Sequence, residues 1–266
     1  MSLTIEGKTA IVTGAANGVG LAIARHFADK GANVMFADMD EARLQDEIGD
    51  QPEDTNIRYF AGDLRERLTI ANLLSATLDA FDRVDILVNG SRQIMPSDPL
   101  DMDDDSVITL LNQNLMTSYR LSQLVAKRMI KQGCGQDEDA SGAIINLSSI
   151  AARRTHPDLL GYSVSTAALD QMTRSMAVAL APHNIRVNAV AFGSVMSASL
   201  KGALKENAEF RGDIETRTPL GRIAAPRELA ETVQFLASDG AGFTTGQILT
   251  VDGGRTLLDT VTAPAH

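Results

Sequence analysis

The segment TGAANGVG, residues 13–20, joins the apolar run KTAIVTG (8–14) to the helical pattern LAIARHFADKG (21–31). Its glycines would let the backbone approach a pyrophosphate closely, and the N-terminus of the next helix would offer N–H groups and positive potential. The spacing Gly-x-x-x-Gly-x-Gly differs from the commonest fingerprint, G-x-G-x-x-G, and a purely structural turn is the alternative. The strand before the loop and the helix after it favour a loop that binds the phosphates of a dinucleotide.

Asp38 ends the next apolar run, NVMFAD (33–38). A carboxylate at this position can accept hydrogen bonds from both hydroxyls of an adenosine ribose, and it would repel a 2′-phosphate. The glycine loop contains no arginine, and the residue after Asp38 is the uncharged Met39. We therefore predict NAD as the cofactor, in preference to NADP.

Short apolar runs alternate with helical patterns along the whole chain. Most of the runs are continuously apolar, which is typical of parallel strands covered on both faces. Helix boundaries are marked by Gly31 as a C-cap, by Pro226 in a first turn and by the acidic segment 101–106. The pattern predicts an α/β fold, a doubly wound sheet with right-handed crossovers in a single domain, 1–266. The expected strands are 8–14, 33–38, 57–63, 85–90, 142–149, 185–193 and 247–254.

Composition excludes several classes of partner. The chain has 266 residues with 24 basic and 34 acidic side chains, and its cations are not clustered, so nucleic acid is not an expected partner. No apolar run is long enough to cross a bilayer, and the first residues do not resemble a signal peptide. The single cysteine, Cys134, excludes an internal disulfide and is expected in a loop. These features predict a cytoplasmic protein.

Several motifs occur in an order that resembles the short-chain dehydrogenase/reductase family over nearly the whole chain. That family has a single Rossmann-type domain with a seven-stranded parallel sheet and helices on both faces, often assembled as a tetramer. The resemblance implies an NAD(P)-dependent oxidoreductase acting on an alcohol or ketone, and a homo-oligomer, either a tetramer or a dimer. The motifs are TGAANGVG, GDL (62–64), DILVN (85–89), NLMTS (114–118), INLSS (145–149), Tyr162, IRVNAVAFG (185–193) and TGQILTVDGG (245–254).

The resemblance also implies roles for individual residues. Tyr162 would be the general acid/base, Ser149 would hold the substrate oxygen, and Asn114 would position a water in a proton relay. A larger set would bind the cofactor: the loop residues would meet the pyrophosphate, Asp63 and Leu64 the adenine, Asn89 the nicotinamide-side ribose and Ser197 the carboxamide. The full cofactor set is Gly14, Asn17, Gly18, Val19, Gly20, Asp38, Asp63, Leu64, Asn89, Tyr162, Thr166 and Ser197.

The sequence departs from the family pattern where the chemistry would occur. The family's Tyr-x-x-x-Lys reads Tyr162-Ser163-Val164-Ser165-Thr166, its Asn-Asn-Ala-Gly reads Asn89-Gly90-Ser91-Arg92, and its Pro-Gly reads Phe192-Gly193. Residues four apart share a helix face, so a lysine at 166 would lie beside the phenol and favour its ionised form. A free tyrosine has a pKa of about 10, so only about one in a thousand is ionised at pH 7. Threonine supplies no charge, although its hydroxyl can hydrogen-bond a ribose.

Other cations offer a replacement for the missing lysine. Arg92 stands where the family has a small glycine, and Arg153, Arg154 and His156 lie between Ser149 and Tyr162. We hypothesise that one of them offsets the lysine or binds an acidic group of the substrate. The alternative is that they are solvated basic residues on loops.

Two functions remain open on sequence grounds. The first is an NAD(P)-dependent oxidoreductase with ordinary or weakened activity. The second is a catalytically impaired dinucleotide-binding protein that serves as a sensor or assembly subunit. Nucleophile and metal chemistry are disfavoured, since GYSVS lacks the last residue of G-x-S-x-G and the four histidines are scattered. Segment 194–224 is predicted to be a substrate lid, and amphipathic helix packing is the alternative.

Overall fold

The computed structural model describes residues 3–49, 55–133, 141–207 and 209–259, and the statements below concern that part of the chain. A seven-stranded sheet has the order β3-β2-β1-β4-β5-β6-β7, and every neighbouring pair is parallel. This confirms the predicted α/β fold. Cys134, which we expected in a loop, lies outside the described residues. The strands are β1 Thr9–Thr13, β2 Asn33–Asp38, β3 Ile57–Ala61, β4 Ile86–Asn89, β5 Gly142–Ser149, β6 Ile185–Phe192 and β7 Ile248–Val251.

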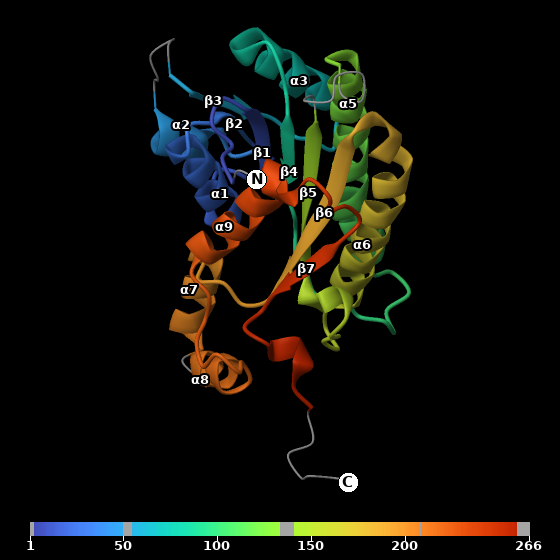
Figure 1. Ribbon diagram of the computed structural model, residues 1–266. Helices are drawn as coiled ribbons and strands as arrows, with labels where there is room; N and C mark the ends of the chain where they lie inside the picture. Colours follow the sequence, from blue (N-terminus) through green and yellow to red (C-terminus); the bar gives the residue numbers. More distant parts are fainter. Residues whose placement is uncertain (1–2, 50–54, 134–140, 208, 260–266) are drawn as a thin grey trace.

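Helices cover both faces of the sheet (Figure 1). On one face, α1, α2 and α9 contribute to a core that contains Phe27, Leu44 and Val233; on the other, α3, α5 and α6 contribute to a second core that contains Leu73 and Leu121. The helices are α1 Gly18–Asp29, α2 Glu41–Ile48, α3 Arg67–Phe81, α4 Ser106–Leu110, α5 Thr117–Lys131, α6 Leu160–Leu180, α7 Ala198–Glu206, α8 Glu209–Thr216 and α9 Pro226–Ala237. A π-helical turn spans Leu111–Met116, and 3-10 turns span Ile150–Ala152, Ala181–His183, Asp239–Ala241 and Arg255–Leu257.

The predicted helix boundaries agree with the structure. After α1 the chain turns at Gly31, whose φ is +80°, and α9 begins at Pro226. The acidic segment 101–106 precedes α4, which begins at Ser106. None of the helices in the described residues combines the length and the apolar character that crossing a bilayer requires.

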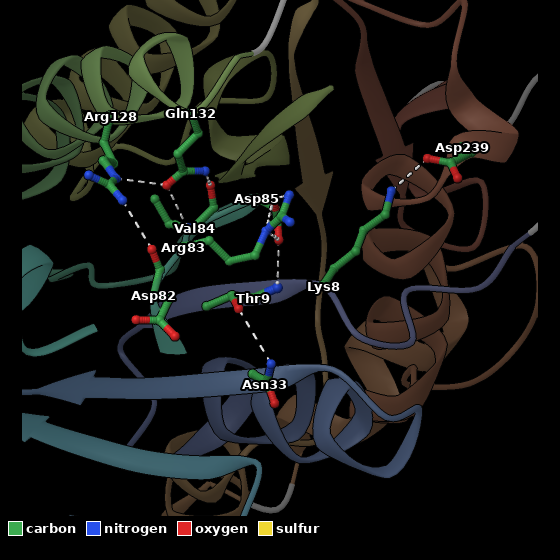
Figure 2. A network of polar contacts seen from close by, with 10 residues as sticks. All are labelled: Lys8, Thr9, Asn33, Asp82, Arg83, Val84, Asp85, Arg128, Gln132 and Asp239. Carbon is green, nitrogen blue, oxygen red and sulfur yellow. Dashed lines mark hydrogen bonds and ion pairs between the residues drawn. The ribbon is translucent and has the colours of Figure 1, made fainter. Parts of the chain in front are cut away.

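Polar contacts stabilise the amino ends of the strands, as Figure 2 shows. Asp85, just before β4, accepts a hydrogen bond from the Thr9 N–H at 2.9 Å and pairs with Arg83 at 2.7 Å. The Gln132 side chain bonds both the N–H and the carbonyl of Val84, at 3.0 and 2.9 Å. Because this edge is opposite to the glycine loop, we assign these contacts a structural role.

Candidate active site

The carboxyl ends of β1 and β4 mark the point where successive strands change from one side of the sheet to the other. In doubly wound sheets, ligands bind in the crevice outside these ends. The loops that follow the two strands are joined, because Thr13 Oγ1 accepts the N–H groups of Gly90 and Ser91 at 2.9 and 3.1 Å. A Cβ added to Gly14 would lie 2.7 Å from the Gly90 carbonyl oxygen, so the two backbones are in contact.

The loop 13–20 has a backbone that only glycine adopts readily. Gly14 and Gly18 have φ values of +70° and +58°, and a Cβ on Gly20 would lie 2.1 Å from the Gly14 carbonyl oxygen. Asn17 precedes α1 and makes no side-chain cap, which leaves the first-turn N–H groups without one. Val19 packs into the core, so only its backbone faces the loop. This geometry fits a pyrophosphate at a helix N-terminus.

Asp38 lies against the glycine loop. Its Oδ2 accepts the Ala16 N–H at 3.0 Å, and its Oδ1 accepts the Asp40 N–H at 3.2 Å. The carboxylate is therefore held beside the loop that would carry the pyrophosphate, as an adenosine-ribose ligand requires.

The predicted adenine contacts, Asp63 and Leu64, are already engaged within the protein. The Arg65 side chain donates to both carboxylate oxygens of Asp63, with Nη2 2.6 Å from Oδ2. That hydrogen bond lowers the pKa of the Asp63 carboxyl below its ordinary value. Leu64 is buried in the second core, so any adenine contact would come from the accessible part of this segment.

Ser197 is brought to the glycine loop from far along the sequence. Its Oγ accepts the Leu200 N–H at 3.3 Å and caps α7, and a Cβ added to Gly18 would lie 3.7 Å from the Ser197 Cβ. The start of α7 and the start of α1 are therefore adjacent.

Ser149 and Tyr162 lie at the same edge of the sheet. Ser149 ends β5, is paired in register with Phe192 of β6, and accepts the Ala151 N–H at 3.1 Å through its hydroxyl. Tyr162 occupies the first turn of α6 and is only 3% exposed. A serine hydroxyl can also donate, so Ser149 retains the chemistry to bond a substrate oxygen.

Thr166 has no charge to offer the Tyr162 phenol, and its hydroxyl proton is donated to the helix backbone. It lies one turn after Tyr162 and is 3% exposed. Its Oγ1 is 2.9 Å from the Tyr162 carbonyl oxygen and 3.2 Å from that of Ser163, so the hydroxyl donates back into its own helix.

Arg92 reaches the Tyr162 phenol. Its Nη1 lies 3.1 Å from the phenol oxygen, and its guanidinium carbon lies 4.3 Å from the centre of the Phe192 ring. The ends of β4 and β6 and the first turn of α6 thus converge at one cation.

The other cations considered from the sequence point elsewhere. Arg153 donates to Thr250 Oγ1 at 3.2 Å, and Arg154 donates to the Thr256 carbonyl oxygen. His156 is exposed beside Asp158, at 3.7 Å. Of these four basic side chains, only Arg92 bonds the Tyr162 phenol within the described residues.

Asn114 and Asn89 are both buried and bonded within the protein. Asn114 Oδ1 accepts the Gln93 N–H at 2.8 Å, and its Nδ2 donates to the Gln93 carbonyl and to Ser165 Oγ at 3.0 and 3.1 Å. Asn89 Nδ2 donates to Ser122 Oγ and Asn146 Oδ1 at 2.9 and 2.8 Å. The Asn114 side chain holds the backbone at Gln93, whereas the Asn89 side chain bonds two buried side chains. Their expected roles toward water and ribose stay predictions.

Comparisons with known proteins decide the family. A family model described as enoyl-(acyl carrier protein) reductase matches residues 14–256. The chain is 32% identical over 254 residues to the 3-oxoacyl-(acyl-carrier-protein) reductase of Thermotoga maritima, covering 95% of this chain and 99% of that protein. It is 33% identical over 255 residues to the 7alpha-hydroxysteroid dehydrogenase of Escherichia coli, covering 95% and 96%. The chain belongs to the short-chain dehydrogenase/reductase family.

A solved short-chain dehydrogenase/reductase structure supports the same assignment. It is a 7alpha-hydroxysteroid dehydrogenase in complex with NADH and 7-oxo glycochenodeoxycholic acid, with a TM-score of 0.84, 33% identity and coverage of 95% of both chains. The relatives named here are oxidoreductases. This chain is therefore a member of an oxidoreductase family, as its motifs implied.

Several residues that shape this short-chain dehydrogenase/reductase site were not predicted. Thr13 joins the β1 and β4 loops, Gln113 Nε2 donates to Ser91 Oγ at 3.3 Å, and the Phe192 ring supports Arg92. Phe192 was noted as a departure from Pro-Gly, but only the fold brings its ring under the guanidinium. No sequence signal distinguishes Gln113 from other helix-surface glutamines.

A cavity of about 300 Å³ lies beside the start of α6. The two segments that line it are joined, because the Ser97 N–H donates to the Asp158 carbonyl at 2.9 Å and the Gly161 N–H donates to Ser97 Oγ at 3.0 Å. Within the described chain, no group of three or more His, Cys, Asp or Glu residues could hold a metal ion. The cavity is lined by Ile94, Met95, Pro96, His156, Asp158 and Leu159.

Proposed function

We propose that this protein is an NAD-dependent oxidoreductase that interconverts an alcohol and a ketone. The observation that carries the proposal is the placement of Tyr162 at the edge of the sheet that also holds the glycine loop. Arg92 links Tyr162 to the β4 loop, and Thr13 links that loop to the glycine loop. The proton-transfer residue and the cofactor loop thus belong to one connected site.

The residues have separate tasks in this proposal. The loop 13–20 and Asp38 hold the pyrophosphate and the adenosine ribose. A bound nicotinamide supplies the hydride acceptor or donor. Ser149 orients the substrate oxygen by a hydrogen bond, and the Tyr162 oxygen takes up or gives back the proton of that hydroxyl.

The cofactor and substrate classes follow from the same surroundings. The carboxylate of Asp38, held against the glycine loop, favours a ribose with both hydroxyls over a 2′-phosphate. The cavity beside α6 is mainly lined by apolar side chains, which favours a substrate with an apolar body. We further propose a cytoplasmic homo-oligomer, a tetramer or a dimer, whose state light scattering would measure.

The experiment that tests the function is Tyr162→Phe, assayed with NAD and a panel of secondary alcohols. We expect turnover to fall about 100-fold or more, because general acid/base catalysis contributes about 10²–10⁴. NAD affinity, measured by fluorescence titration, should fall far less than turnover, because the loop 13–20 and Asp38 still hold the cofactor. Tyr119→Phe is the matched control, because Tyr119 lies on α5 and its hydroxyl accepts a hydrogen bond from the Gln123 side chain of the same helix.

Two results would contradict the proposal. Failure to bind NAD at millimolar concentration would remove the cofactor role. Binding of NAD without turnover of any substrate in the wild type would instead favour the dinucleotide sensor, a function that the oxidoreductase relatives do not favour.

A further inference from the structure

We propose that Arg92 supplies the positive charge beside Tyr162 that the family pattern places at the position of Thr166, and that it stabilises the ionised phenol. The catalytic consequence rests on the proposed function, but the contact does not depend on any ligand. Arg92 Nη1 lies 3.1 Å from the phenol oxygen, whereas the uncharged Thr166 donates its hydroxyl to the Tyr162 carbonyl.

The charge of Arg92 is available to the phenol. Among the ion pairs of the described residues, none includes Arg92. Its guanidinium instead lies over the Phe192 ring, with 4.3 Å to the ring centre, an arrangement that holds a cation without neutralising it. Phe192 and Tyr162 are buried and Arg92 is half-buried, so water screens the interaction with an ionised oxygen less than it would on an open surface.

The backbone on both sides of Arg92 is anchored. The Ser91 N–H donates to Thr13 Oγ1 at 3.1 Å, and the Ser91 side chain accepts a hydrogen bond from Gln113 at 3.3 Å. Asn114 bonds both the N–H and the carbonyl of Gln93, at 2.8 and 3.0 Å. Gln113 and Asn114 belong to the same π-helical turn, which therefore fixes the residues before and after the arginine. A side chain on a fixed backbone loses less freedom when it holds one geometry, so the site is preorganised.

The preference for the ionised phenol follows from simple electrostatics. A neutral phenol oxygen accepts an ordinary hydrogen bond from the guanidinium, whereas a phenolate accepts a charge-assisted one and adds the attraction of opposite charges. The guanidinium thus stabilises the phenolate more than the phenol. Arginine stays protonated throughout the accessible pH range, so this effect persists at alkaline pH, where a lysine would lose its charge.

The test measures phenol ionisation without cofactor or substrate. Ultraviolet difference spectra report tyrosine ionisation, and Tyr162→Phe identifies the Tyr162 component among the chain's three tyrosines. The titration is limited to the pH range in which circular dichroism shows an unchanged fold. We expect Arg92→Ala to move the ionisation midpoint of Tyr162 upward by about one pH unit or more. Arg154→Ala, the matched control, should leave the midpoint unchanged.

A second measurement follows turnover. Arg92→Ala should lower kcat about tenfold or more with little change in KM, and Arg92→Lys should recover most of it. Thr166→Lys should raise kcat more in the Arg92→Ala background than in the wild type, because the two cations serve the same oxygen and their effects are not additive.

The outcomes separate this inference from the proposed function. A midpoint that shifts in Arg92→Ala, in a protein that turns over no alcohol or ketone, supports the role of Arg92 and contradicts the proposed function. Turnover in the wild type with an unchanged midpoint and an unchanged kcat in Arg92→Ala contradicts the inference alone. A wild-type phenol that stays protonated until the fold is lost, or an Arg92→Ala variant in which only KM rises, also overturns it.

Discussion

At residue 162 the neighbours in sequence and the neighbours in space differ. The residue one turn later, Thr166, turns its hydroxyl into the helix, and the phenol bonds Arg92, which lies 70 positions earlier. Helical spacing identified the position from which a charge was missing, because residues four apart share a face. It could not identify which arginine replaces that charge, because Arg92, Arg153 and Arg154 become distinguishable only when the loops are placed.

A single carboxylate is expected to determine cofactor choice. Asp38→Asn removes the charge and retains an oxygen that can accept the Ala16 N–H, now bonded at 3.0 Å. Loss of the repulsion toward a 2′-phosphate should improve NADP binding relative to NAD by about tenfold or more, or about 1.4 kcal/mol. Fluorescence titration of both cofactors measures the ratio, with Asp40→Asn as the control, and an unchanged ratio in Asp38→Asn would contradict the ribose role.

At the scale of elements, the segment 194–224 leaves the sheet and returns to it at a narrow base. Val195 and Ala224 form a parallel bridge, and the N–H of Met196 donates to the Ala224 carbonyl at 2.9 Å. Between these points lie α7 and α8, which extend away from the sheet in Figure 1. The bounds of the segment and its function as a lid stay predictions.

The first turn of α9 is stabilised by Glu228. Its carboxylate pairs with Arg222 at 2.7 Å and accepts the Ala225 N–H at 2.8 Å. The Arg222 hydrogen bond, followed by that of Ala225, lowers the pKa of Glu228 to about 2. Because α9 packs against α1, the loss of this contact should weaken the face of the sheet that carries the glycine loop.

Glu228→Gln should lower the free energy of unfolding at pH 7 by about 1 kcal/mol, since the pair is partly exposed and screened by solvent. The folded-state pKa lies below its ordinary value, so the wild-type contribution is present above about pH 4.5 and is lost as the pH falls toward 2. Urea unfolding at pH 7 and pH 3 measures the difference between wild type and variant. The control is Glu231→Gln, in the exposed pair with Arg227; a difference that does not shrink at pH 3 would be inconsistent with this role.

At the scale of the whole molecule, polar side chains are buried between the sheet and the helix α6. Asn146 of β5 donates to Thr173 Oγ1 at 2.8 Å, and Ser148 donates to Asp170 Oδ1 at 2.6 Å. Burial raises the pKa of Asp170 above its ordinary value, against the lowering effects of the Ser148 hydrogen bond and of the Arg153 and Arg174 charges. These contacts align α6 on β5, and so they align Tyr162 with Ser149.

Asp170→Asn should become more stable relative to the wild type as the pH rises from 4 to 7. The folded-state pKa of Asp170 is raised, so the wild-type contribution is present below the unfolded value, 3.8, and is lost as the pH rises through the folded value. Asparagine keeps an oxygen for Ser148 and stays uncharged. Urea unfolding across this range measures the change; a difference independent of pH, or an equal trend in the exposed control Asp213→Asn, would refute the explanation.

Local patterns were sufficient for most of the fold. The runs at 33–38 and 142–149 coincide with β2 and β5, and Pro226 begins α9, because continuous burial and helix-capping preferences are written in neighbouring residues. The predicted parallel pairing is confirmed, whereas the order of the strands was not predicted and comes from the tertiary structure. Roles for Asn114 and Asn89 were harder to predict, since a buried amide bonds whatever the fold places beside it.

The sequence by itself determined the doubly wound sheet and placed the glycine loop after its first strand, and it predicted the roles of Asp38, Ser149 and Tyr162. These depend on spacing within elements and on motif order. Only the tertiary structure decided the partner of the phenol. Arg92, Phe192 and Tyr162 come from three segments, and they meet because β4, β5 and β6 are adjacent and α6 begins at their carboxyl ends. Contacts between such distant segments depend on how loops are anchored, and no local spacing encodes that geometry.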